Sequence, residues 1–266
     1  MPPDWAEIVG WISLGFGFAC ALIIVVDELV VGHRQQMAIM NLVHPITALY
    51  WGPVWLWAYF AHGRNSSVKV IQARAHKLAA QGADPRPLKA EGESVEKIRA
   101  WDIGNAVSHC GAGCTLGDIG GEWIVWALGP WMIGATGTLG AEYVWDFPLA
   151  WAFGIVFQYF TIVPMRKNVG TLNGVWQAMR ADTLSIVSFQ VGLFGWMAVS
   201  HELIWSPPLH ITTAAQWWMM QVGMVVGYFT AWPVNRWLIR NGWKEKMDDR
   251  KPLGMMVERL EQEQAA

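Results

Sequence analysis

Thiol, imidazole and carboxylate side chains are concentrated in one short segment, residues 109–123, which reads HCGAGCTLGDIGGEW. The chemistry-bearing residues of this segment are His109, Cys110, Cys114, Asp118 and Glu122. Thiolates and imidazoles are soft or borderline ligands that favour Cu(I) or Zn(II). Carboxylates can bind a cation or transfer protons as general acids and bases. The residue types therefore indicate a metal site or acid–base chemistry.

The spacing of these residues predicts one polar face on a helix. Four of them recur at intervals of four residues: Cys110, Cys114, Asp118 and Glu122. A second series with the same interval consists of Gly113, Gly117 and Gly121. Small residues at this spacing let membrane helices pack closely. We expect the polar groups to face a bundle interior, since a carboxylate near the bilayer centre costs at least ~2.5–3.5 kcal/mol.

The composition of the whole chain is typical of a membrane protein. Hydrophobic residues make up 53% of the sequence and charged residues only 15%, whereas a soluble domain has about a quarter charged residues. A helix needs about 20 mostly apolar residues to cross a bilayer. Six segments meet this requirement: 8–26, 37–61, 106–134, 139–165, 183–204 and 214–238. The sequence therefore predicts an all-α, polytopic transmembrane helix bundle with six spans.

The positions of Lys and Arg predict the orientation, because cytoplasmic loops are enriched in these residues. Basic residues gather in the 62–105 connection, after the fourth span and at the C-terminal end, and only Arg34 falls on the opposite side. Both termini are then cytoplasmic. The predicted units are two N-terminal spans (1–61), a cytoplasmic loop with an amphipathic helix (62–102), a four-helix membrane domain (103–240) and a charged cytoplasmic tail (241–266). The amphipathic helix is either a dock for lipid or a partner at the inner membrane surface or a solvated connector.

A second set of candidate ligands would lie on the outer side, above Glu122, in this orientation. They are His44 in the second span, His201 at the end of the fifth, and Met219, Met220 and Met224 in the sixth. Thioethers are soft ligands, although Met is also a common core residue. We expect a single site along the third span, with His109, Cys110 and Cys114 on its inner side. A buried cation, copper first and zinc second, would supply the missing counter-charge.

Several segments together resemble a known family. They are HCGAGCTLGDIGGEW, FQYFTIVPMR (157–166), ADTLS (181–185) and PVNRWLIR (233–240). They are similar to a bacterial membrane family catalogued as a domain of unknown function, DUF4396. The likeness covers roughly residues 100–250 well and 44–64 moderately. It implies a multi-pass protein of the bacterial cytoplasmic (inner) membrane and implies no activity.

Three functions stay open. The first is binding or transport of a soft metal ion. The second is a membrane enzyme acting on a lipid or isoprenoid, with Asp118 and Glu122 as acid and base. The third is a non-catalytic subunit of a larger membrane complex. The expected partners are the lipid bilayer and other membrane subunits, and a homo-oligomer is left open. No P-loop, GxGxxG, HExxH or nucleophile-elbow motif is present, and no nucleic-acid partner is expected.

Overall fold

The computed structural model describes residues 2–94, 96–132, 137–165, 171–244, 246 and 250–265. These residues form helices joined by turns and short connections, apart from one isolated antiparallel bridge between Gln35 and Ser67. The predicted all-α class is confirmed for this part of the chain.

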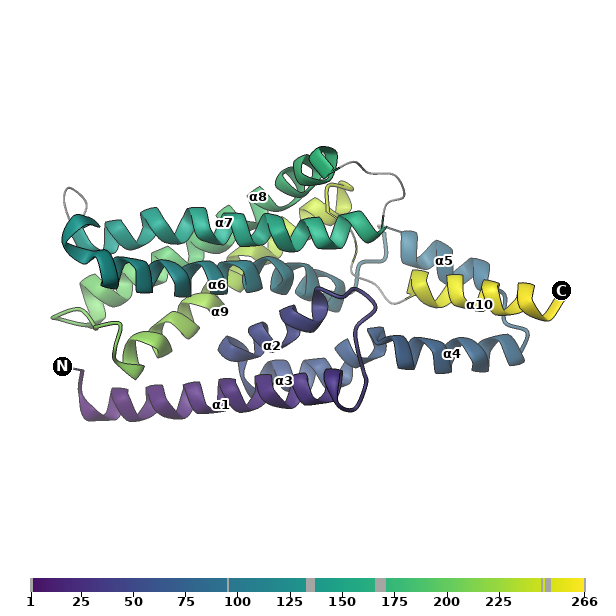
Figure 1. Ribbon diagram of the computed structural model, residues 1–266, viewed down its shortest axis with the longest axis horizontal. Coiled ribbons are helices and arrows are strands. Elements are labelled where there is room, and N and C mark those ends of the chain that lie inside the picture. The colour runs from purple at the N-terminus through teal and green to yellow at the C-terminus, as the bar shows by residue number, and fades with distance from the viewer. Residues whose placement is uncertain are drawn as a thin grey trace.

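Four long helices form the main bundle (Figure 1). They run in alternating directions: α6 (Ala100–Met132), α7 (Gly137–Met165), α8 (Thr171–Val199) and α9 (Ala214–Arg240). A short π-helix, η2 (Ser200–Ile204), continues α8. The α1 helix (Asp4–Leu29) packs along α9. The bundle core contains fully buried side chains from α6 and α8, among them Val107, Phe189 and Leu193.

Two stretches of the described chain are long and apolar enough to cross a membrane. They are Asp4–Leu29, with a mean hydropathy of 2.4, and Asn173–Ile204, with 1.4. The α1 helix also exposes large apolar side chains, including Trp11 (64%) and Phe18 (63%). Such continuous apolar surface is unusual on a protein surrounded by water. A weak membrane signature is therefore present in the structure itself.

The predicted span at 37–61 is two helices that form a hairpin. They are α2 (Met40–Trp51) and α3 (Pro53–Ala61), and the chain reverses between them at Gly52. Gly52 has a φ of +54°, which L side chains rarely adopt, and Pro53 has no N–H to continue the helix. The chain on either side of the hairpin is paired, because Gln36 N donates to Ser66 O at 3.2 Å and Val68 N donates to Arg34 O at 2.9 Å. Residues 37–61 therefore do not form one continuous helix.

The hairpin also corrects the placement of Arg34. The end of α1 is tied to the segment that follows α3, since Asp27 Oδ1 lies 3.1 Å from Arg64 Nη2 and Asp27 Oδ2 accepts from the Tyr59 hydroxyl at 2.9 Å. Arg34 therefore lies at the same end of the bundle as the basic connection, and the predicted position on the opposite side is wrong. The N-terminus lies at the far end of the bundle from the C-terminus (Figure 1).

Three shorter helices form a separate unit beyond that end of the bundle (Figure 1). They are α4 (Val68–Ala80), which follows the short η1 (Gly63–Ser66), α5 (Pro85–Glu93) and α10 (Arg250–Ala265). The predicted amphipathic helix exists as α4. Its apolar residues Ile71 and Ala75 are buried with Leu253 and Val257 of α10. This face packs against the C-terminal helix, so it is not free to lie on a membrane.

Candidate cation site

The glycine series of α6 brings α7 into close contact. A Cβ on Gly117 would overlap the backbone of Ala150, and a Cβ on Gly113 would lie 2.8 Å from the Cα of Gly154. A Cβ on Gly121 would overlap the carboxylate of Asp146. The predicted packing role of the glycines is confirmed. It places the polar face of α6 beside the first half of α7.

Four buried carboxylates lie along the contact between α6 and α7, without converging on one point. Asp118 (0% exposed) and Glu122 (4%) come from α6, and Glu142 (7%) and Asp146 (2%) come from α7. Glu122 lies within electrostatic range of Glu142 and Asp118, and Asp146 lies within electrostatic range of the other three. We call these four residues the carboxylate cluster. The sequence has no Lys or Arg between residues 100 and 165 or between 181 and 235, so no neighbouring basic residue on these helices neutralises the cluster.

The cluster retains acceptor oxygens that have no partner in the described part of the chain. Asp118 Oδ1 accepts a hydrogen bond from Gln190 Nε2 of α8 at 2.8 Å, while Asp118 Oδ2 and Asp146 Oδ1 are buried and unpartnered. A buried polar atom without a partner is unfavourable unless a proton, a water molecule or a cation satisfies it. The cluster therefore has the chemistry of a site for a positive charge.

At the end of the cluster nearest the start of α9, the polar groups continue with Gln216 and His201. Gln216 at the start of α9 is 2% exposed and lies beside both Glu122 and His201. His201 lies in η2 and is 8% exposed. Two of the predicted site residues, Glu122 and His201, are thus joined through an amide that the sequence analysis did not identify.

The three methionines face the bundle interior. Met219, Met220 and Met224 are 4%, 5% and 2% exposed. Met224 Sδ lies 3.7 Å from the Thr115 hydroxyl oxygen of α6, one residue after Cys114. Because Gln216 meets Glu122 and Met224 meets Thr115, α9 runs antiparallel to α6. Met220 is consequently placed on the stretch of α9 that faces the level of Asp118.

The two cysteines of α6 precede the carboxylates along that helix and lie beside the tip of the α2–α3 hairpin. Cys110 and Cys114 are free thiols with no exposed surface. The buried Tyr50 hydroxyl is within electrostatic range of both thiols. A Cβ on Gly111 would lie 2.8 Å from that hydroxyl oxygen. The hairpin thus brings a phenol to the inner half of the predicted site.

The match to a known family covers this part of the molecule. The model of a domain of unknown function, DUF4396, matches residues 101–244, which is more than half of the chain. The chain belongs to the DUF4396 family. No curated protein and no solved structure matches it. The DUF4396 domain contains the carboxylate cluster, both cysteines and the three methionines, whereas α1 and the hairpin lie outside it.

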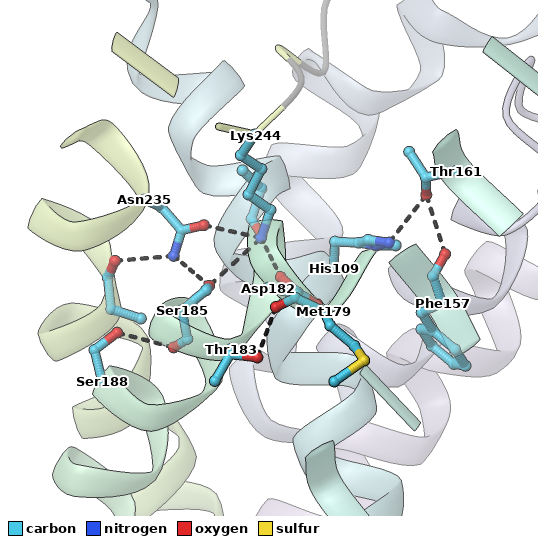
Figure 2. Close-up of polar contacts among 12 residues, drawn as sticks. His109, Phe157, Thr161, Met179, Asp182, Thr183, Ser185, Ser188, Asn235 and Lys244 are labelled. Carbon is cyan, nitrogen blue, oxygen red and sulfur yellow. Dashed lines mark hydrogen bonds and ion pairs between the residues drawn. The ribbon is translucent and has the colours of Figure 1, made fainter. Parts of the chain in front are cut away.

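The end of the DUF4396 domain at which α9 ends holds a buried polar network (Figure 2). Lys244, the last residue of the family match, forms an ion pair of 2.7 Å with Asp182 of α8, and both side chains are fully buried. His109 lies nearby, with its Nε2 3.0 Å from the Thr161 hydroxyl and its Nδ1 unpartnered. Cys114 is within electrostatic range of both Asp182 and Asp118. A column of buried polar groups therefore runs along α6, from the inner network to the carboxylate cluster.

His44 is not brought to the other predicted ligands. Its ring lies among the aromatic rings of Trp55, Tyr59 and Trp101, with centroid separations of 6.0, 5.2 and 6.2 Å. Trp101 is in the first turn of α6, about 25 Å along a helix from Asp118 at 1.5 Å per residue. The predicted outer position of His44 is wrong because the hairpin turns back at Gly52.

The described side chains are not arranged as a closed coordination shell. No three or more His, Cys, Asp or Glu groups in that part of the chain converge as a ready ligand set. The predicted residues of α6 instead lie at successive levels along the helix: His109 near the Lys244–Asp182 ion pair, then the thiols, then the carboxylates. Glu142 and Asp146 were missed, although their four-residue spacing in the next apolar segment repeats that of Asp118 and Glu122.

Proposed function

We propose that the chain is a multi-pass protein of the bacterial cytoplasmic membrane with five crossing helices, α1 and α6 to α9. The α2–α3 hairpin enters from the inner side and turns back, and the N-terminus lies outside. The distribution of charge supports this topology. All 19 Lys and Arg residues fall within residues 34–99, 166–180 and 236–259, and the segments at the other end of the bundle carry none. Basic residues on one side mark it as cytoplasmic.

The function that we propose for this bundle is binding of a divalent metal cation at the carboxylate cluster, in exchange for protons. The observation that carries the proposal is a set of four buried carboxylates along the α6–α7 contact, two of which have an unpartnered oxygen, with no Lys or Arg on either helix. Ionised carboxylates in an apolar interior are unfavourable, so they hold protons or surround a cation. A metal ligand must be deprotonated, and metal binding therefore releases protons.

The ligand chemistry favours Zn²⁺ or Mn²⁺ at this level over copper. The groups that meet at the cluster are carboxylate oxygens with the Gln216 amide oxygen beside them. Carboxylate oxygens suit Mn²⁺ and are also ligands of Zn²⁺, whereas Cu(I) prefers thiolate and thioether sulfur. The two thiols, Cys114 and Cys110, lie one to two helical turns further along α6 from Asp118.

The sulfur atoms of Cys110, Cys114 and Met224 form a second candidate site, which would bind copper(I) on the cysteine side of the carboxylate cluster. Cys110 and Cys114 lie beside the hairpin tip, and Met224 Sδ reaches Thr115, the residue that follows Cys114. Thiol and thioether groups at one depth suit a soft cation. The two candidate sites can be distinguished by substitution, because Cys110→Ser with Cys114→Ser removes the thiol ligands of the copper site and leaves the carboxylates in place.

Metal binding to the purified protein in nanodiscs tests the proposal. Zn²⁺, Mn²⁺ and Cu(I) are titrated by calorimetry into the parent protein, Glu122→Gln and Glu202→Gln. Glu202 is the matched control, since it is an exposed carboxylate next to His201. We expect Zn²⁺ or Mn²⁺ to bind the parent and Glu202→Gln alike and to bind Glu122→Gln at least tenfold more weakly, a change of about 1.4 kcal/mol or more. Equal binding to Glu122→Gln and Glu202→Gln would refute the site.

A further inference from the structure

The ammonium group of Lys244 is surrounded by four oxygens at the inner end of the bundle (Figure 2). Lys244 Nζ donates to Asp182 Oδ1 at 2.7 Å, to the Ala106 carbonyl at 3.0 Å and to Asn235 Oδ1 at 3.0 Å, and it lies 3.4 Å from Ser185 Oγ. Lys244 as a whole is only 3% exposed. We call the four oxygen-bearing residues Ala106, Asp182, Ser185 and Asn235 the oxygen cage.

The oxygen cage is built by the helices and not by the segment that carries Lys244. Ala106 belongs to α6, Asp182 and Ser185 to α8, and Asn235 to α9. Asn235 Nδ2 donates to Ser185 Oγ at 2.7 Å and to the Ala231 carbonyl at 2.9 Å, which turns the amide oxygen toward the ammonium. The oxygens are therefore held in position by contacts that remain when the Lys244 side chain is absent.

The composition of the oxygen cage is that of a site for a hard cation. A carboxylate, a main-chain carbonyl, an amide oxygen and a hydroxyl are the ligand types that such cations take. Asp182 Oδ2 is also buried and has no partner in the described chain, which leaves a further acceptor for an ion. An ammonium group is similar in size and charge to a potassium ion.

We propose that the oxygen cage is a monovalent-cation site in which the protein's own Lys244 ammonium stands in for K⁺ or Na⁺, and that an alkali cation enters when Lys244 is withdrawn. The site is distinct from the carboxylate cluster. The inference does not depend on a metal binding at that cluster, because the cage can be tested with alkali salts alone.

Thermal unfolding in different salts tests the inference. The parent protein, Lys244→Met, Lys244→Met with Asp182→Asn, and Lys69→Met are unfolded in detergent at equal ionic strength in KCl, NaCl or choline chloride. Lys69 is the matched control, since it is a lysine at the surface whose Nζ lies 3.4 Å from a single carbonyl. A ligand that binds the folded state raises Tm as its concentration rises. We expect KCl or NaCl to raise the Tm of Lys244→Met by several degrees over choline chloride, saturably, and to leave the other three proteins without this alkali-specific shift.

A second variant, Lys244→Ala, provides the test if Lys244→Met folds poorly. Lys244→Ala leaves room for a free cation, so ammonium and potassium salts should raise its Tm or its yield of monodisperse protein, while choline should not. Equal Tm values of a folded Lys244→Met and a folded Lys244→Ala in all salts would overturn the inference. So would failure of both variants to fold in every salt, since an alkali cation should refill the cage.

Discussion

The Cα of Gly121 lies directly against the carboxylate of Asp146, so that even a methyl group at position 121 would overlap Asp146 Oδ1. This contact joins the packing function of the glycine series to the chemistry of the carboxylate cluster. Gly120, the adjacent residue, has only an ordinary contact, because its Cβ would lie 3.7 Å from a Leu149 methyl carbon. The two neighbouring glycines therefore provide a matched pair of substitutions.

Gly121→Ala is expected to destabilise the protein, because overfilling a packed interface costs about 1–3 kcal/mol. Gly120→Ala should leave the free energy of unfolding unchanged or raise it by about 0.5–1 kcal/mol, as Ala replaces Gly in a helix. Chemical unfolding of both variants in detergent measures the difference. Equal free energies of unfolding would contradict the close packing of α6 on α7.

The proposed topology predicts that Asp4 and Lys77 lie on opposite sides of the membrane. Single cysteines are placed at these exposed positions after Cys20, Cys110 and Cys114 are replaced by Ser. A membrane-impermeant maleimide should label Asp4→Cys in intact cells and Lys77→Cys only after the membrane is opened. Labelling of both residues from the same side would restore the six-span arrangement with both termini inside and contradict the hairpin topology.

The thiols of Cys110 and Cys114 are expected to be reduced and slow to react. Both side chains are fully buried beneath the hairpin tip, and both are free in the structure. Intact mass spectrometry after brief treatment with N-ethylmaleimide should show no adduct on the native protein and an adduct on each thiol after unfolding. A Cys110–Cys114 disulfide, or rapid alkylation of the folded protein, would contradict this placement.

The local pattern of α6 could be predicted from the sequence because a helix repeats it every four residues. The Gly113–Gly117–Gly121 series and the polar face beside it follow from that period alone. The partners of Asp118 could not be found in this way. Glu142 and Asp146 meet it only because α6 and α7 form an antiparallel pair, and Gln190 belongs to a third helix.

The hairpin was missed for a different physical reason. The 25 residues from 37 to 61 are apolar enough to cross a bilayer, and hydropathy does not distinguish crossing from turning back. Gly52-Pro53 breaks the helix, but the pairing of Gln36 with Ser66 that closes the hairpin is a tertiary contact. Lys244 was assigned to a solvated tail because its ion pair with Asp182 joins residues 62 positions apart.

Proton release on metal binding tests the central claim most directly. The protein in weakly buffered solution is titrated with Zn²⁺ or Mn²⁺ while a pH indicator counts the protons released, for the parent, for Glu122→Gln with Glu142→Gln, and for Glu202→Gln. We predict that the parent and Glu202→Gln release protons as the metal binds, that binding weakens as the pH is lowered, and that the double variant loses both effects. Metal binding with the same proton release in the double variant, or no proton release from the parent, would contradict cation-for-proton exchange at the carboxylate cluster.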